Sequence, residues 1–182
     1  MTDDAALIEQ VRSGDTSAFE PLVRKYQEKV YRLCCSFVGA SAAEDAAQEI
    51  FVKVFESLDQ FKSKSSFATW LYRVAANHCL NIIAKRKRER LESLDAIVEH
   101  YGDSAGQLKD GADSIAVAEN REYLKSLLVQ LPPDQKTALI LREVNGLSYQ
   151  ELADTLEISM DAVKVRLFRA RQSLVQAAQK GK

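Results

Sequence analysis

Four cationic side chains stand close together in "SMDAVKVRLFRAR", residues 159–171, at Lys164, Arg166, Arg169 and Arg171. Cations at this spacing can hold phosphate groups, and an arginine can also donate two hydrogen bonds to the edge of guanine. The whole chain carries a formal charge of −1, which is low for a protein that binds DNA alone. The segment is therefore either a solvated helix surface or a DNA-binding element that acts with a partner.

A second group of polar and aromatic residues lies in "SFATWLYRVAANHCLNIIAKRKR", residues 66–88. Rings beside cations suit single-stranded nucleic acid, because bases stack on the rings while cations follow the backbone. An amide such as Asn77 can pair with a base that has left the stack. The structural alternative is that Trp70 and Leu71 belong to a core and that residues 85–88 only complement a helix end. The candidate contacts are Trp70, Arg73, Asn77, Asn81, Lys85 and Arg86.

Few residues suit other kinds of chemistry. The histidines are His78 and His100, and the sequence has no glycine-rich phosphate loop and no cluster with metal-ligand spacing. We therefore expect no enzymatic activity, no cofactor and no metal. His78 is either a DNA contact or a packed side chain. For Cys34, Cys35 and Cys79 we expect buried, reduced thiols, and the alternative is a redox switch, which needs an exposed and activated thiol.

Helices must position these residues, because apolar residues recur at helical spacing almost throughout and glycine and proline are scarce. Ser41, with Glu44 three residues later, predicts a capping box at the start of one helix. Together the helical segments predict an N-terminal domain over residues 1–88. The segments are residues 5–39 with a break at 14–15, residues 44–61 and residues 67–88.

Residues 89–128 differ in character from the rest of the chain. They hold nine acidic and four basic residues, a net charge of −5, whereas residues 1–88 and 129–182 each carry +2. Their polar, glycine-containing composition predicts a flexible acidic linker. The overall charge of −1 therefore hides two positively charged domains.

Helix start and stop signals divide residues 129–182. Ser148 and Glu151 predict a capping box, and a short helix follows over about 149–156. A three-residue turn then leads to Ser159 as the N-cap of the next helix. Two short helices joined by a tight turn predict a helix-turn-helix, so the fold is all-α with two domains. The remaining signals are Pro132 and Pro133 for helix entry and Gly146 for a helix stop.

The faces of the last helix follow from a rotation of about 100° per residue. One narrow arc is apolar and must face the core, and the opposite arc reaches base edges if the helix enters the major groove, while flanking cations hold phosphates. The first turn suits an anion, such as Asp161. The core arc holds Val163, Leu167, Ala170 and Leu174; the outer arc holds Asp161, Val165, Phe168 and Arg169; the flanks hold Lys164, Arg166 and Arg171.

Four segments together resemble the motifs of bacterial extracytoplasmic-function sigma factors. They are "DAAQEIFVKVF", "FATWLYRVAANHCLN", "LPPDQKTALILREVNGLSYQELA" and "VKVRLFRARQSL", in the family's order, and the match covers about residues 5–88 and 129–175. The resemblance implies two helical domains, of which the first recognises and helps open the −10 element and the second reads the −35 element. The third core domain of larger sigma factors has no counterpart, since only the linker occupies its place.

The resemblance also implies roles for single residues. Asn77 stands at the pocket for a −10 base, and Val165 departs from the small polar residue expected there, so the −35 base preference stays open. The neighbouring DNA path would be followed by Arg73, Asn81, Lys85 and Arg86. The helix that docks on the polymerase clamp helices would use Asp45, Gln48, Glu49 and Lys53. The −35 element would be read by Lys164, Val165, Arg166, Phe168, Arg169 and Arg171.

The implied function is that of an alternative sigma factor. Its partners would be core RNA polymerase, through the largest-subunit clamp helices and the flap, promoter DNA and an anti-sigma factor, with no small-molecule substrate. The acidic N-terminus and the lack of a run of about 18 apolar residues predict a cytoplasmic protein that does not insert into a membrane. The linker either occupies the channel that nascent RNA later fills or is only a tether.

The alternative function is a stand-alone transcriptional regulator with a helix-turn-helix output domain. Such a protein binds specific DNA tightly without polymerase, and it needs an N-terminal sensor or dimerisation domain. Dependence of DNA binding on polymerase therefore separates the two functions.

Overall fold

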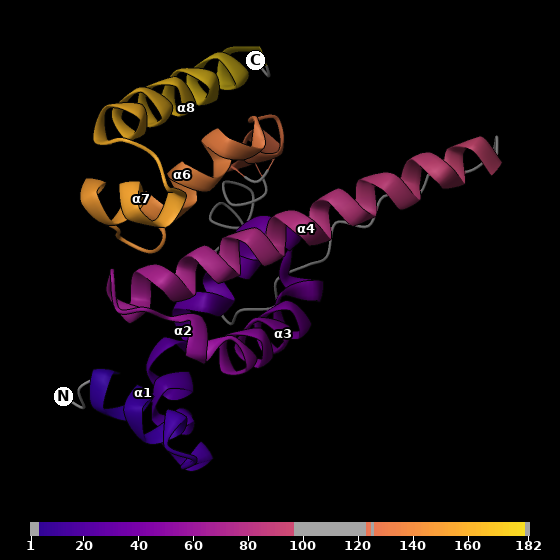
Figure 1. Cartoon of the computed structure of the whole chain (residues 1–182). Coiled ribbons are helices and arrows are strands. Elements are labelled where there is room, and N and C mark those ends of the chain that lie inside the picture. Colours follow the sequence, from indigo (N-terminus) through magenta and orange to yellow (C-terminus); the bar gives the residue numbers. More distant parts are fainter. Residues whose placement is uncertain (1–3, 97–122, 125, 181–182) are drawn as a thin grey trace, which may run out of the picture. The chain divides into compact units, whose positions relative to one another are not determined.

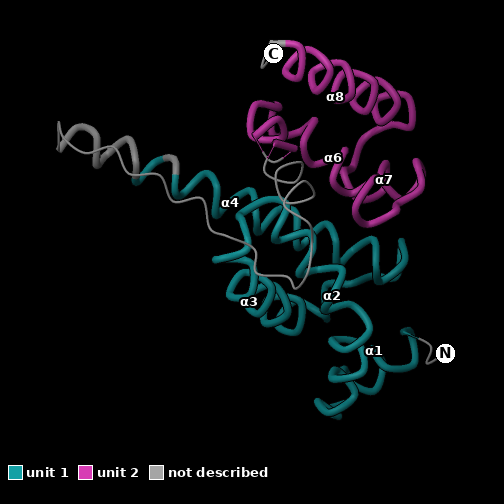
Figure 2. The backbone as a smooth tube through the Cα atoms, turned by 180° about the vertical axis from the view of Figure 1, so that it is seen from behind, with its two compact units in different colours: residues 1–107 teal, residues 108–182 magenta. Residues whose placement is uncertain are grey.

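The computed structural model describes residues 4–96, 123–124 and 126–180 of the 182-residue chain. All regular structure in these residues is helical, which confirms the all-α prediction. The chain forms two compact units, residues 1–107 and 108–182 (Figure 2). Most of the predicted acidic linker, residues 97–122 and 125, lies outside the described residues. The predicted domain boundaries at 88 and 129 stay predictions.

The first unit is built around three packed helices (Figure 1). Helix α2 packs against α3 and α4, α3 also packs against α4, and α1 packs against α2. The helix α4 continues eight residues past the predicted end at 88. The helices are α1 Asp4–Arg12, α2 Phe19–Val38, α3 Ala43–Glu56 and α4 Phe67–Ala96, with 3-10 turns η1 Thr16–Ala18, η2 Ala40–Ala42 and η3 Leu58–Gln60. The fully buried side chains include Leu22, Val30, Leu33, Ile50, Val54 and Leu71.

The start of α3 differs from the sequence prediction. No side chain caps this helix, so the predicted capping box of Ser41 and Glu44 is wrong. Gly39 has a φ of +84° and ends α2, and the 3-10 turn that follows delivers the chain directly into α3. Ser41 therefore lies inside a turn and not at the N-cap. The helix also ends at Glu56, because the last part of the predicted segment forms η3.

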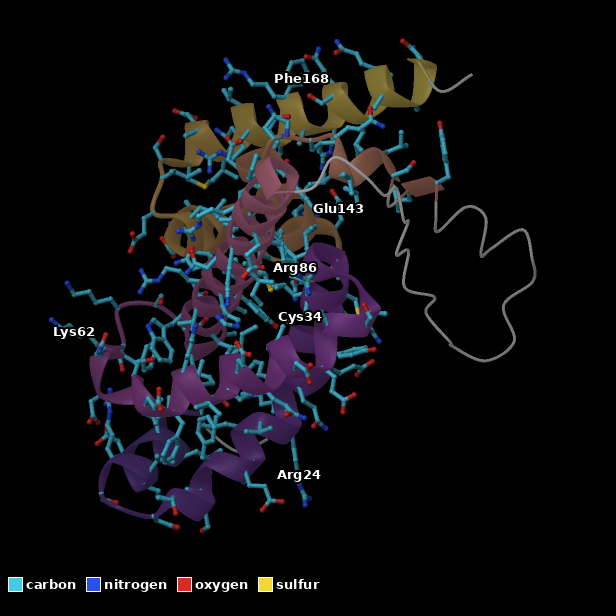
Figure 3. The ribbon with its side chains drawn as sticks, turned by 90° about the vertical axis from the view of Figure 1, so that its right-hand side faces the viewer. Arg24, Cys34, Lys62, Arg86, Glu143 and Phe168 are labelled. Carbon is cyan, nitrogen blue, oxygen red and sulfur yellow. The ribbon has the colours of Figure 1, made fainter. Side chains whose placement is uncertain are left out.

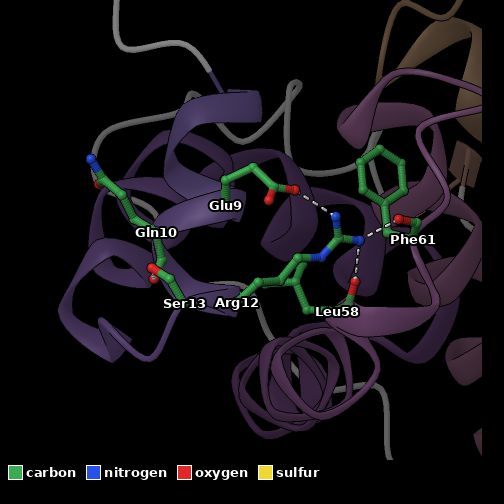
Figure 4. A network of polar contacts seen from close by, with 6 residues as sticks. All are labelled: Glu9, Gln10, Arg12, Ser13, Leu58 and Phe61. Carbon is green, nitrogen blue, oxygen red and sulfur yellow. Dashed lines mark hydrogen bonds and ion pairs between the residues drawn. The ribbon is translucent and has the colours of Figure 1, made fainter.

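Helix α1 is tied to the segment before α4 by one arginine (Figure 4). The Arg12 guanidinium donates hydrogen bonds to the carbonyl of Leu58, at 3.0 Å, and to the carbonyl of Phe61. It also pairs with Glu9 at 2.8 Å. The break between α1 and α2 falls at the predicted place, where Gly14 has a φ of +106°. A positive charge thus satisfies backbone carbonyls that the short turn η3 leaves open.

The second unit contains the predicted helix-turn-helix. Ser148 Oγ accepts from the N–H of Glu151 at 3.2 Å, and the Glu151 carboxylate accepts from the N–H of Ser148 at 2.7 Å, so this capping box is confirmed. Glu157 adopts a φ of +55° after α7, and Ser159 Oγ accepts from the N–H of Ala162 at 3.2 Å. The helices are α6 Pro133–Glu143, α7 Tyr149–Leu156 and α8 Met160–Lys180, and residues 126–129 are also helical.

The core of the second unit lies where α8 packs on α6 and α7. Pro132 is the N-cap of α6 and Pro133 lies in its first turn, as predicted, while Gly146, with a φ of +73°, lies in the turn after it. The described helices include none that is long and apolar enough to cross a lipid bilayer. The innermost side chains include Ile140, Leu141, Leu152, Val163, Leu167 and Ala170.

Candidate functional site

Helix α8 presents the outer face that the sequence predicts. Val163, Leu167 and Ala170 are buried against the unit. On the opposite side, Val165 is 47% exposed and Phe168 is 60% exposed; Figure 3 labels Phe168 on α8. Helix packing does not use these apolar side chains, which leaves them free to contact a partner.

The cations of α8 differ in their partners. Lys164 pairs with Asp161 at 3.0 Å, Arg166 approaches Asp134 of α6 at 3.4 Å, and Arg171 pairs with Glu143 of α6 at 2.9 Å. The hydrogen bond from Arg171 to Glu143 raises the pKa of this guanidinium.

Arg169 is exposed and has no ion pair with any residue that the structure describes. Among Lys164, Arg166, Arg169 and Arg171 it is therefore the cation that can approach a base without first leaving an acid. The pairs of Lys164 and Arg171 are exposed, and breaking one of them costs about 0–1 kcal/mol, whereas the Arg166 side chain is half-buried.

A row of polar side chains runs along α4. Arg73, Asn77, Asn81 and Lys85 follow one another at intervals of four residues, which keeps them on one side of a helix. Asn77, Asn81 and Lys85 are exposed, and Arg73 is half-buried. Arg86 instead donates to the carbonyl of Val38 at the end of α2, at 3.1 Å, where a cation also meets the negative end of the helix dipole.

The aromatic side chain of Trp70 belongs to the core. It is 7% exposed, and its ring lies 5.3 Å from that of Phe61 and 5.9 Å from that of Phe67. Leu71 is fully buried beside it. The geometry favours the structural alternative for both residues, since this ring face is not available for stacking on a base. Trp70 instead anchors the first turns of α4, which carry Arg73 and Asn77.

The four residues that the resemblance places on polymerase share the outer face of α3. Asp45, Gln48, Glu49 and Lys53 are all exposed. Together with Val52 and Glu56 they line a shallow depression on this helix. The face is mostly acidic with one cation, which suits a basic or mixed partner surface.

His78 of α4 lies between two of these residues. Lys53 Nζ donates to His78 Nδ1 at 2.6 Å, and Glu49 Oε2 lies 2.9 Å from Nε2, a close approach without the alignment of a hydrogen bond. The ring is 6% exposed, which favours the packed alternative over a DNA contact. Burial, and next the charge of Lys53, lower the pKa of His78 although Glu49 acts in the opposite direction. The sequence does not predict this link, because Lys53 and His78 are 25 residues apart and no local pattern shows that their helices meet there.

Cys34 and Cys79 are buried as expected, whereas Cys35 is not fully buried. Cys34 and Cys79 are fully buried with their sulfur atoms 3.8 Å apart, and Cys35 is half-buried. The hydrogen bond with Cys79, and next burial, raise the pKa of the Cys34 thiol. A protonated, enclosed thiol is a poor nucleophile, so the geometry favours the structural role. In the described ranges, no three His, Cys, Asp or Glu side chains gather where they could hold a metal ion.

Comparisons with known protein sequences agree with this geometry. Residues 22–89 match the family model of sigma-70 region 2, and residues 121–174 match that of sigma-70 region 4. The chain is 37% identical over 175 residues to the ECF RNA polymerase sigma-E factor of Escherichia coli K12, covering 94% of this chain and 92% of that protein. It is 38% identical over 182 residues to the RNA polymerase sigma-H factor of Pseudomonas aeruginosa, covering 97% and 94%.

Solved structures show the same fold. CnrH in complex with the cytosolic domain of CnrY has a TM-score of 0.70 and 25% identity, covering 98% of this chain and 99% of that chain. A sigma factor of Bartonella quintana in complex with the anti-sigma factor NepR has a TM-score of 0.69 and 23% identity, covering 88% and 96%. Both sigma-70 regions, in order, and relatives of nearly equal length determine the family: the chain belongs to the extracytoplasmic-function sigma factors of bacterial RNA polymerase.

Proposed function

We propose that this chain binds core RNA polymerase, recognises promoters with α4 and α8, and opens DNA by trapping an unstacked base, without catalysing a reaction itself. The observation that carries the proposal is the outer face of α8, where the exposed and unpaired Arg169 stands beside Val165, with cations on both flanks, on a properly capped helix-turn-helix. An element of this shape presents side chains to the major groove. The protein would act in the cytoplasm, where polymerase and promoter meet.

Within the −35 reading helix, roles follow from exposure. Arg169 would contact guanine, and Val165 or Phe168 would touch a thymine methyl. Lys164, Arg166 and Arg171 would hold phosphates after exchanging their acidic partners, which the exposed pairs of Lys164 and Arg171 permit most readily.

In α4, the exposed Asn77 would receive the flipped −10 base, while Arg73, Asn81 and Lys85 follow the strand. Arg86 would contribute at the edge of this path, where it already holds the end of α2. Trp70 would support the site from the core and would not touch DNA.

The acidic face of α3, with Asp45, Gln48, Glu49 and Lys53, would dock on the clamp helices of the polymerase largest subunit, and the second unit would contact the flap. An anti-sigma factor is a further proposed partner, since a solved sigma factor of the same fold is in complex with the anti-sigma factor NepR.

A binding experiment separates this proposal from the stand-alone regulator. A pool of random duplex DNA is incubated with the chain alone, with core polymerase alone and with both, and the bound DNA is sequenced. We expect specific enrichment only when both proteins are present. Specific enrichment by the chain alone, unchanged by polymerase, would favour the regulator. Glu49→Ala should reduce retention of the chain by polymerase, and Glu28→Ala, which removes an exposed acid of α2, is the matched control.

A further inference from the structure

The link between α3 and α4 runs through three side chains whose chemistry fixes the hydrogen positions. A lysine ammonium has only donors, so His78 Nδ1, 2.6 Å from Lys53 Nζ, must be the unprotonated acceptor. A neutral imidazole then carries its proton on Nε2, the nitrogen that lies 2.9 Å from Glu49. Burial favours the same neutral form, because it lowers the pKa of this ring.

The neutral ring separates two charges that would otherwise meet. Glu49 and Lys53 are four residues apart on α3, with the acid toward the N-terminus, which is the favourable order for a direct ion pair on a helix. In the structure each side chain instead approaches a different nitrogen of His78. The imidazole thus holds the acid and the base apart.

Both charges remain available to a partner in this arrangement. The Glu49 side chain is 62% exposed and Lys53 is exposed, although the ring between them is buried. An ammonium with one donor on His78 has two donors left, and the carboxylate can accept several hydrogen bonds. A direct pair between Glu49 and Lys53 would use these groups on each other.

We propose that His78 is a positioning residue for polymerase docking, which keeps Glu49 and Lys53 apart and directed toward the clamp helices. This inference rests on the proposed docking role of α3. His78 does not touch polymerase; it acts through the two side chains that do. Because it belongs to α4 and follows Asn77, it also fixes the docking face against the helix that carries the proposed −10 site.

Binding of the full chain to core polymerase, measured by fluorescence anisotropy, tests the inference. His78→Leu fills the buried position with an apolar side chain and removes both ring nitrogens, so Glu49 and Lys53 can pair directly. We expect affinity about tenfold weaker than wild type, which corresponds to about 1.4 kcal/mol. His78→Asn, whose amide oxygen can take the place of Nδ1, should recover most of this loss. Cys79→Ala, which removes buried volume from the same helix outside the network, is the packing control.

A double-mutant cycle shows whether His78 acts through Lys53. Lys53→Ala should weaken binding, and adding His78→Leu to it should weaken binding by no more than about twofold, because the direct pair between Glu49 and Lys53 that the ring prevents can no longer form. At saturating polymerase, His78→Leu should open promoters at the wild-type rate. Independent, multiplicative losses, or a slower opening rate at saturation, would overturn the inference.

A spectroscopic measurement keeps the inference testable if His78→Leu fails to fold. The ring nitrogen chemical shifts of wild-type His78 should show a neutral ring protonated on Nε2, and Lys53→Ala should shift the Nδ1 resonance. A ring protonated on Nδ1 would overturn the inference. If wild type binds polymerase and His78→Leu binds equally well, only the inference fails; if wild type does not bind, the proposed function fails.

Discussion

At the scale of single residues, the cations of α8 fall into two groups, those that pair with an acidic side chain and Arg169, which pairs with none that the structure describes. Asp134 and Glu143 of α6 hold Arg166 and Arg171 at the flanks, while Arg169 points outward without an acidic partner in the described residues. A bidentate contact with the edge of guanine needs a guanidinium that is free of other partners, whereas a flanking cation needs only to lie near a phosphate. The division therefore favours base recognition by Arg169 and backbone contacts by its neighbours.

Replacement of Arg169 by alanine tests this division. Arg169→Ala should reduce discrimination between the preferred −35 sequence and a variant with one base pair changed by about 1–3 kcal/mol. Lys164→Ala should instead weaken binding to all sequences by a similar factor and lower its salt dependence. Competition binding of the polymerase complex to matched promoters measures both effects. Uniform weakening in Arg169→Ala would assign this residue to the backbone.

Asn77 is tested by separating binding from opening. Asn77→Ala removes the amide that would pair with the unstacked base, so open complexes should form more slowly while affinity for core polymerase stays at the wild-type value. Permanganate reactivity of promoter thymines reports the opening, and anisotropy reports the affinity. An equal loss in both measurements would make Asn77 a structural residue.

The histidine between α3 and α4 predicts a pH dependence of stability. The pKa of His78 is lowered in the folded protein, so as pH falls through about 6.5 the unfolded chain binds a proton first. The contribution to the free energy of unfolding is complete above this pH and is lost below it, with a slope of at most about 1.4 kcal/mol per pH unit. Urea unfolding of wild type and His78→Leu from pH 5 to 8 should show a steeper dependence of the free energy of unfolding on pH in wild type. Equal slopes would contradict it.

At the scale of elements, the same sequence pattern gave two outcomes. A serine followed three residues later by glutamate caps α7 at Ser148 but does not cap α3 at Ser41. The difference arises upstream, because Gly39 with its positive φ and the 3-10 turn after it bring the chain into α3 already helical. The sequence pattern of serine and glutamate is local, but the backbone conformation of the residues before the helix decides whether the serine forms a cap.

These two serines form a matched pair for measurement. Ser148→Ala should destabilise the second unit by about 1 kcal/mol, because it leaves a backbone N–H at the start of α7 without its partner. Ser41→Ala should change stability by less than about 0.5 kcal/mol. Amide hydrogen exchange in α7 and α3 measures each helix separately. A loss in α3 equal to that in α7 would contradict the assignment of the caps.

How far the sequence predicts the elements depends on the range of the interactions. The buried arc of α8 with Val163 and Leu167 follows from helical period alone, and the structure confirms it. Contacts between helices, such as Arg166 with Asp134 or His78 with Lys53, depend on packing that no local pattern encodes. Trp70 is a further example, because the sequence pattern of an aromatic residue beside cations is the same whether the ring faces DNA or the protein core.

At the scale of the whole molecule, charge is divided among segments. Residues 1–88 and 129–182 each carry +2, while residues 89–128 carry −5. A net charge near zero therefore does not oppose two positively charged contacts with DNA, and in the proposed function polymerase would supply the remaining affinity. The acidic segment would either serve as a soluble tether or occupy a positively charged channel of the polymerase.

The most direct test of the central claim is transcription in vitro from a library of promoters with random sequence, using core polymerase with and without this chain. We predict transcripts that depend on the chain and whose promoters share two elements at a fixed spacing. Arg169→Ala should relax only the upstream element, and Asn77→Ala should reduce opening at the downstream element. Transcripts that are the same with and without the chain, or that share a single element, would contradict the account.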